Sequence, residues 1–280
     1  MVPRSNECTD KMIGINHVGK KKERLANQMF QYAAVKGIAK NMGYQFCVPP
    51  SKFKSNADQW EEHQLFFPFT LETFNPLQIQ WIDSKRPVLQ ERQFHFDEEL
   101  FNNCPDWVSL WGFYQSEKYF LNVRDELIKD FTFKDDIKNP CLEMMEGLNK
   151  PIALHVRRTD YAQYGHHPIV SLEYYEKALS YFNKDRPVVV LSDDPAWCHE
   201  QPLFADDRFM VSESGDQYVD LCLMTMCSDF IIANSSFSWW GAWLSESVNK
   251  QVIAPSKWFG PPLDQRNNTQ DLYCEGWMKV

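Results

Sequence analysis

Residues 151–161 read PIALHVRRTDY, an apolar run that passes directly into two arginines and an aspartate. The run 152–156 has the length and composition of a buried strand, and the polar residues mark its end. The same pattern recurs in 187–195 (PVVVLSDDP) and in 230–236 (FIIANSS). We therefore predict three buried strands, each followed by a polar segment.

Helical patterns separate these strands. Residues 171–182 are predicted to form an amphipathic helix with Ser171 as its N-cap, and 220–227 and 237–244 two more helices. Short strands are expected at 206–211 and 251–254. This alternation favours a parallel, doubly wound sheet, in which ligands bind beyond the carboxyl ends of the strands.

The N-terminal half predicts a second α/β lobe. Residues 25–42 have helical periodicity, Gly43 suits a helix stop, and strands are expected on either side, at 12–17 and 44–48. Loops and short elements are expected over 51–106, a strand at 107–113 and a helix at 117–131. The charged segment 135–150 is our candidate boundary, which gives lobes 1–150 and 151–280.

Charge and composition exclude some classes of partner. The chain has 280 residues, a net charge of −9 and a pI near 5.3, which disfavours a nucleic-acid binder. The cluster Lys20-Lys21-Lys22 with Arg24 is short, and we interpret it as a solvated loop.

The eight cysteines have neither CxxC nor zinc-ligand spacing, so we expect no metal site. We also expect a reducing, cytoplasmic setting for this chain. No apolar run is long enough to cross a membrane, which leaves peripheral association open.

Arg157 and Arg158 are the first candidate site residues. A guanidinium matches phosphate oxygens in a bidentate manner and keeps its charge at any working pH. Asp160 adds a possible acid or base, and His155 a second donor. From these residues alone, an arginine pair locked to structural carboxylates is an equally good interpretation.

The other two strand ends carry polar groups as well. Asn234, Ser235 and Ser236 precede a helix, where they could serve as simple N-caps or, with exposed backbone N–H groups, bind an anion. Asp193 and Asp194 could accept hydrogen bonds from ribose or guanine, or cap a helix that starts near 195. We expect the tryptophans of 239–243 to pack in the core.

The order of these motifs resembles the α-1,2-fucosyltransferase family, glycosyltransferase family 11. HVRRTDY and NSSFSWWGAWL together are quite specific for it. The matching segments are 25–32 (LANQMFQY), 112–120 (GFYQSEKYF), 155–161, 171–175 (SLEYY), 191–195 (LSDDP) and 231–244.

The resemblance implies a GT-B-like α/β fold of two Rossmann-type lobes, whose parallel sheets face a cleft. The first lobe (1–150) would take the acceptor, and the second (151–280) GDP-fucose. It implies inverting transfer of L-fucose from GDP-β-L-fucose to the 2-hydroxyl of a galactose-containing glycan, in glycan or polysaccharide synthesis. No cofactor or obligatory metal is implied.

Carried over to this sequence, the resemblance gives the donor a set of contacts. The arginines would hold the diphosphate, an aspartate the guanosine, and the helix start the β-phosphate, while two residues reach in from the first lobe. The residues so implied are His155, Arg157, Arg158, Asp193, Asp194, Asn234, Ser235, Ser236, Phe237, Asn27 and Gln28.

Asp160 is the first candidate for the general base, and His166 and His167 are weaker ones. Asp160 could instead orient an arginine.

The family's glycine-rich segment before the first helix is replaced here by Glu23-Arg24-Leu25-Ala26, where glycine would allow close approach to phosphate. The loss of these glycines leaves a non-catalytic protein that binds a nucleotide sugar or a glycan open as an alternative. The other alternative is an α-1,6- or O-fucosyltransferase-like enzyme, because those enzymes share a similar arginine motif.

Overall fold

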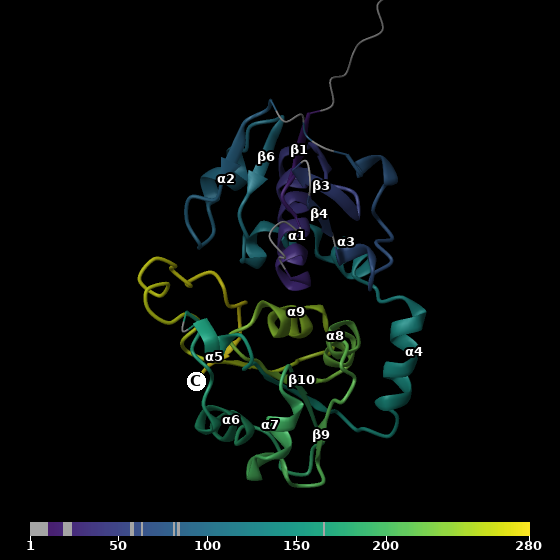
Figure 1. The fold of residues 1–280 in the computed structure, drawn as a ribbon, viewed down its shortest axis with the longest axis vertical. Coiled ribbons are helices and arrows are strands. Elements are labelled where there is room, and N and C mark those ends of the chain that lie inside the picture. Colours follow the sequence, from purple (N-terminus) through teal and green to yellow (C-terminus); the bar gives the residue numbers. More distant parts are fainter. Residues whose placement is uncertain are drawn as a thin grey trace, which may run out of the picture. The chain divides into compact units, whose positions relative to one another are not determined.

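The computed structural model describes residues 11–18, 24–56, 59–62, 64–80, 82, 85–164 and 166–280. They form two compact units, drawn in Figure 1: one contains Leu71–Asp130 with the chain up to Phe67, the other Phe131–Val280 with Pro68–Thr70. The basic cluster at 20–22 and Glu23 lie outside the described residues, so the solvated loop expected there stays a prediction.

The boundary between the units falls at 130/131, whereas we predicted it at 150. The charged segment that suggested the later boundary forms a helix, α4 (Asp135–Met144), with Pro140 inside it. This helix packs on α8 (Gln217–Thr225), where Cys141 is buried. Residues 131–150 therefore belong to the C-terminal unit.

The N-terminal unit is built on a four-stranded parallel sheet with the order β2-β1-β6-β5. The strands expected near residues 12, 45 and 108 are confirmed, although each is shorter than predicted. The four strands are β1 (Met12–Gly14), β2 (Gln45–Cys47), β5 (Val88–Gln90) and β6 (Val108–Trp111).

The first helix, α1 (Leu25–Met42), has the predicted bounds. It ends at Gly43, whose φ of 68° is a left-handed conformation that glycine adopts without strain. The helix is buried on nearly all sides, because it packs against β1 and β2 and also against α2 (Glu98–Asn103).

The segment 51–106 contains short elements, as expected. β3 (Lys52–Asn56) and β4 (Gln59–Glu62) pair as an antiparallel hairpin. Two 3₁₀ turns follow, η2 (Gln64–Phe66) and η3 (Pro76–Gln78). Helix α2 begins after Asp97, whose carboxylate accepts a hydrogen bond from the N–H of Leu100.

The single helix predicted over 117–131 was wrong. The segment forms two 3₁₀ turns, η4 (Glu117–Tyr119) and η5 (Leu121–Val123), before α3 (Arg124–Asp130). The break lies where the chain crosses α1: a Cβ on Gly37 would clash with the carbonyl oxygen of Tyr119. Local periodicity could not show this crossing.

The C-terminal unit contains a six-stranded parallel sheet with the order β12-β11-β10-β7-β8-β9. Five strands were predicted, and the last one was not. They are β7 (Ile152–Val156), β8 (Val188–Ser192), β9 (Phe209–Val211), β10 (Asp229–Ile231), β11 (Val252–Ala254) and β12 (Met278–Lys279).

The strand order places a topological switch point between β7 and β10. From β7 the chain builds outward through β8 and β9, and it then returns to β10 and builds in the other direction. Ligands of doubly wound sheets bind beyond the carboxyl ends of the strands at such a point. The loops after β7 and β10 are therefore the expected place for a site.

Helices connect these strands and cover the sheet. The predicted helices at 171–182, 220–227 and 237–244 are confirmed with shifted ends. Ser171 occupies the N-cap position of α6, although its side chain accepts no capping hydrogen bond. The connecting elements are α5 (Tyr161–Tyr164), α6 (Leu172–Leu179), α7 (Pro195–His199), η6 (Pro202–Phe204), α8 and α9 (Ser236–Leu244).

The tryptophans of α9 pack in the core, as predicted. Trp239 and Trp240 are fully buried, and the indole N–H of Trp239 donates to the carbonyl oxygen of Leu272 at 2.7 Å. Seven cysteines lie in the described part of the chain, and none of them forms a disulfide. Within the described ranges, no helix combines the length and apolarity that a membrane crossing requires.

Candidate active site

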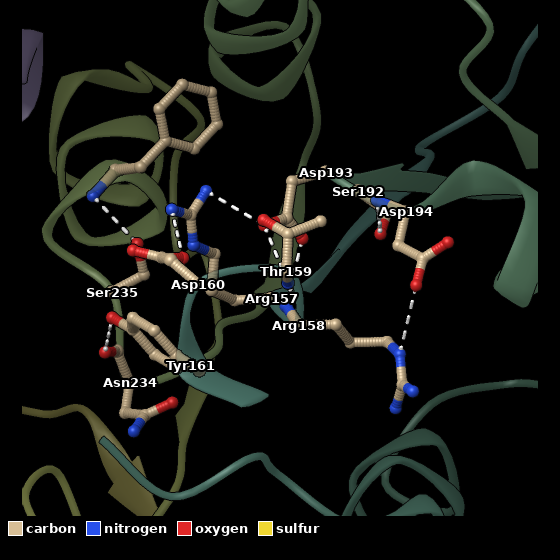
Figure 2. Close-up of polar contacts among 11 residues, drawn as sticks. Arg157, Arg158, Thr159, Asp160, Tyr161, Ser192, Asp193, Asp194, Asn234 and Ser235 are labelled. Atoms are coloured by element: carbon tan, nitrogen blue, oxygen red, sulfur yellow. Dashed lines mark hydrogen bonds and ion pairs between the residues drawn. The ribbon is translucent and has the colours of Figure 1, made fainter. Parts of the chain in front are cut away.

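Arg157 lies directly after β7, at the switch point. Its guanidinium forms one ion pair with Asp160 Oδ1, at 2.5 Å, and another with Asp193 Oδ2, at 3.1 Å (Figure 2). The hydrogen bond to Asp160 uses one of the five N–H groups of a guanidinium. The side chain is 15% exposed, so Arg157 is held in one orientation and remains accessible.

Asp193, the first residue after β8, holds the arginine loop in shape. Its carboxylate accepts hydrogen bonds from the backbone N–H of Arg158 at 2.9 Å and of Thr159 at 3.1 Å, and from the Thr159 hydroxyl. The parallel pairing of Val156 with Ser192 brings the two loops together. Asp193 therefore positions Arg157, a role that the sequence analysis did not assign to it.

Arg158 points away from Arg157 (Figure 2). Its Nε lies 3.4 Å from Asp194 Oδ2, and its guanidinium lies over the ring of Trp197, 3.9 Å from the centroid. Asp194 also caps α7 by accepting from the N–H of Trp197 at 3.2 Å, as the capping interpretation predicted. The structure thus separates two arginines that are adjacent in sequence.

The loop after β10 supplies the N-terminus of α9. Ser235 is the N-cap, and its hydroxyl accepts from the N–H of Phe237 at 3.3 Å, which confirms the capping interpretation. In Figure 2, Asp160 and the guanidinium of Arg157 lie between Ser235 and Asp193. A guanidinium beside a helix N-terminus is a suitable place for an anion, because both offer N–H donors.

Asn234 fixes the base of this loop. Its side-chain nitrogen, Nδ2, donates to the carbonyl oxygens of Pro168 and Trp258, each at 3.0 Å. Its backbone carbonyl oxygen accepts from the Tyr161 hydroxyl. The side chain is almost fully buried, and its oxygen has no hydrogen-bond partner among the described residues. The position of Asn234 favours a structural role, with one acceptor left over.

Ser236 and Phe237, the next two predicted residues, form the half-buried first turn of α9.

His155 is the fourth residue of β7 and lies beneath the loops. Its ring is buried against Phe237, with 5.3 Å between centroids. Burial lowers the pKa of His155 to about 4, although the nearby Asp193 carboxylate opposes the shift. His155 is therefore neutral at physiological pH and can contribute a hydrogen bond, not a charge.

The two later histidines differ in exposure. His166 is exposed, whereas His167 stacks on the ring of Tyr161 with 4.7 Å between centroids. Partial burial lowers the pKa of His167. Asp160 is in direct contact with Arg157 through an ion pair, and no such contact links either histidine to Arg157 among the described residues.

Asn27 and Gln28 lie in the first turn of α1, in the N-terminal unit. The side-chain oxygen of Asn27 accepts from Gln115 Nε2 at 3.0 Å. Gln28 is fully buried, and its side-chain oxygen accepts from the N–H of Gln64 at 2.6 Å. Their predicted contact with a donor in the other lobe stays a prediction. The position of Gln28 favours a role in the core of its own unit.

A comparison with known protein families identifies the family of this chain. The sequence profile of Glycosyl transferase family 11 matches residues 4–280. The chain belongs to glycosyl transferase family 11. The resemblance noted from the arginine and tryptophan motifs is therefore confirmed.

The chain is also similar to curated bacterial and mammalian glycosyltransferases. The chain is 31% identical to the O-antigen biosynthesis glycosyltransferase WbnK of Escherichia coli, over 70% of this chain and 68% of that protein. It is 29% identical to an alpha-1,2-colitosyltransferase of Escherichia coli (91% and 96%). It is 27% identical to galactoside alpha-(1,2)-fucosyltransferase 1 of Bos taurus (80% and 65%).

The fold is also found in solved structures. A crystal structure of POFUT1 in complex with GDP matches with a TM-score of 0.55 at 13% identity, covering 86% of this chain and 96% of that one. The predicted fold class is confirmed: this family 11 chain is α/β and GT-B-like, with two Rossmann-type units that each contain a parallel sheet.

Sequence reasoning missed three polar residues in the N-terminal unit of this family 11 chain. Gln115 orients Asn27, Glu91 accepts two backbone hydrogen bonds, and His17 is buried against Trp111. Gln115 lies in the GFYQS segment that carried the resemblance, so its position could have been found. Nothing in the local sequence distinguishes Glu91 from a solvated carboxylate.

Proposed function

We propose that this family 11 chain transfers L-fucose from GDP-β-L-fucose to the 2-hydroxyl of a galactoside, forming an α-1,2 linkage with inversion. The observation that carries the proposal is the position of Arg157. Its guanidinium lies at the switch point of the sheet, beside the N-terminus of α9, and is held there by two carboxylates. The names of the bovine and bacterial relatives support the linkage.

The proposed step is a single displacement. The acceptor oxygen attacks the anomeric carbon, the bond from that carbon to the diphosphate oxygen breaks, and its electron pair leaves with GDP. Arg157 and the N–H groups at the start of α9 stabilise the negative charge that develops on the diphosphate. Because Asp193 and Asp160 fix the guanidinium beforehand, little reorganisation is needed during the reaction.

The acceptor hydroxyl loses a proton in this step, and Asp160 is our first candidate to take it. Its Oδ1 is engaged by Arg157, so the same carboxylate also orients the guanidinium. His166 is the weaker candidate, because the structure gives it no link to the arginine. The resemblance also assigns Arg158 to the donor diphosphate, although its guanidinium lies over Trp197 and apart from that of Arg157.

A GDP-release assay with GDP-fucose and a panel of galactosides tests the proposal. Arg157→Ala should lower turnover by about 10²–10³-fold, the usual effect of removing one donor to a developing negative charge. Arg186→Ala is the matched control, because Arg186 forms an ion pair with Asp229, at the opposite end of β10 (2.6 Å). Normal turnover in Arg157→Ala would overturn the role of Arg157.

A second donor follows from one relative. Because a 29% identical protein is an alpha-1,2-colitosyltransferase, the assay should include a colitose donor beside GDP-fucose. GDP binding by calorimetry, without acceptor-dependent release from any donor, would identify a binding protein instead.

A further inference from the structure

The loop after β6, residues 112–116 (GFYQS), lies at the carboxyl end of the N-terminal sheet. Strands β1 and β5 pair with β6 in parallel, so their carboxyl ends share this edge. Such an edge is the usual ligand-binding side of a Rossmann-type sheet. None of the five loop residues carries a charged side chain.

A half-buried carboxylate determines the shape of this loop. Glu91, directly after β5, accepts from the N–H of Phe113 through Oε2 and from that of Tyr114 through Oε1, each at 2.9 Å. Tyr114 has a φ of 54°, a left-handed conformation that is unfavourable for a bulky residue. Gly112 has no room for a side chain, because a Cβ there would clash with Glu91.

The loop is also held from α1. The carbonyl oxygen of Gly112 accepts from Gln31 Nε2 at 3.2 Å, and Gln115 donates to Asn27 at 3.0 Å. Both anchors come from side chains of the buried first helix. The backbone of 112–115 is therefore fixed from two directions before any ligand arrives.

This fixed backbone presents one aromatic ring to solvent. Tyr114 is fully buried, whereas Phe113, its neighbour, is 39% exposed. A single exposed apolar side chain is ordinary on a protein surface. The ring of Phe113 is unusual, because its loop is anchored from two directions, is strained and lies at the ligand-binding edge. Backbone strain persists only where the surrounding structure imposes it, and it is concentrated at functional sites.

The charges of the loop indicate the class of ligand. A phosphate would meet no cationic side chain from 112–116. A neutral, hydroxylated ring can lay its C–H face on an aromatic ring while its hydroxyls contact polar side chains. A sugar fits these requirements, and a nucleoside diphosphate does not.

We propose that the ring of Phe113 is a stacking surface for the acceptor galactoside, and that Glu91 is the positioning residue that presents it. The assignment of this sugar as the acceptor rests on the proposed function. Binding of a neutral galactoside at the loop does not require transfer to occur.

The test measures binding directly and then turnover. Dissociation constants for lactose, measured by calorimetry or ligand-observed NMR, are compared among wild type, Phe113→Ala, Phe113→Leu and Phe113→Trp. We expect Phe113→Ala and Phe113→Leu to weaken binding about three- to tenfold, and Phe113→Trp to retain it, because only Trp keeps an aromatic face. Val88→Ala is the matched control, since Val88 is an exposed residue at the amino end of β5.

In the GDP-release assay, Phe113→Ala and Phe113→Leu should raise the KM for the galactoside and leave the KM for GDP-fucose unchanged, whereas Phe113→Trp and Val88→Ala should change neither. Equal lactose affinity in wild type and Phe113→Ala, or no lactose binding by wild type, overturns the proposal for Phe113. Lactose binding that depends on Phe113, without any acceptor-dependent GDP release, supports the sugar surface and contradicts the proposed transferase function.

Discussion

The carboxyl edges of the two parallel sheets carry different chemistry on the same kind of scaffold. In the C-terminal unit the edge has Arg157 and Arg158, interleaved with the carboxylates of Asp160, Asp193 and Asp194. In the N-terminal unit the loop after β6, residues 112–116, has no charged side chain and is held by the carboxyl group of Glu91, whereas the basic cluster at 20–22, in the segment after β1, lies outside the described residues. The topology determines where a ligand can bind, and the loops determine which ligand it is.

The cations of the two units differ in the same sense. Lys36, on α1, is buried with its ammonium 2.5 Å from Asp130 Oδ2 and 3.3 Å from Glu126. The carboxylates of Asp130 and Glu126 compensate the charge of Lys36 inside the N-terminal unit, because a buried charge is stable only beside an opposite charge. Arg157 also has carboxylate partners, yet it remains accessible at a strand end. Accessibility, more than the presence of a cation, separates a binding site from a structural pair.

Each edge also contains one ionisable group whose pKa is shifted toward the neutral form: His155, which is buried, and Glu91, which is half-buried. Burial lowers the pKa of His155 to about 4 and raises the pKa of Glu91 to about 7, the latter against two backbone N–H donors. The cause is the same in both, and the consequences for stability have opposite sign. The pH dependence of unfolding therefore tests the comparison directly.

His155→Asn should reduce the loss of stability of this protein at acid pH. The pKa of His155 in the folded protein lies below its ordinary value of 6.5, so the unfolded chain binds more protons between about pH 6.5 and 4. Stability is present above this window and is lost as the pH falls, by up to about 3 kcal/mol. Denaturant unfolding at several pH values measures the slope.

The variant should unfold with a flatter pH dependence in this window, whatever its overall stability. His166→Asn is the control, because an exposed imidazole is solvated in both states. An unchanged slope in His155→Asn would show that another group is responsible.

Glu91→Gln should change the slope in the other direction. The pKa of Glu91 in the folded protein is above its ordinary value of 4.5, so the folded chain binds more protons between about pH 4.5 and 7. Stability is present below this window and is lost as the pH rises, by about 1–3 kcal/mol, because Glu91 is only half-buried and partly solvated. The same unfolding series measures it.

In Glu91→Gln the loss above pH 5 should disappear. The amide can accept through only one oxygen, so one N–H of Phe113 or Tyr114 also loses its partner. Glu98→Gln, at an exposed position on α2, is the matched control. If stability still falls between pH 4.5 and 7 in Glu91→Gln, the carboxyl group of Glu91 is not the source.

The sequence predicted what depends on local pattern. The bounds of α1, its end at Gly43, the strand β7 and the N-cap at Ser235 all follow from periodicity and capping chemistry. The break within 117–131 does not, because it depends on the approach of Tyr119 to Gly37, about eighty residues away in the chain.

The site shows the same limit. The two adjacent arginines left a phosphate contact and a pair locked to structural carboxylates equally open. The structure gives each arginine its own carboxylate partner, and the diphosphate contact that the resemblance implied for both stays a prediction. Asp193 looked like a ligand-binding residue, yet its carboxylate is occupied by the arginine loop. Side-chain direction depends on which neighbouring strand end supplies a partner, and a single sequence does not contain that pairing.

Asp160→Asn addresses the last open role at the charged edge. If Asp160 mainly orients Arg157, an amide oxygen can still accept from the guanidinium, and turnover should fall only about tenfold, or about 1.4 kcal/mol. The acid limb of the pH–rate profile should then stay in place. If Asp160 is the general base, turnover should fall about 10²–10⁴-fold and the acid limb should vanish. Asp185→Asn, an exposed aspartate of the same unit, is the control. We expect the smaller effect, because the ion pair with Arg157 already engages the carboxylate.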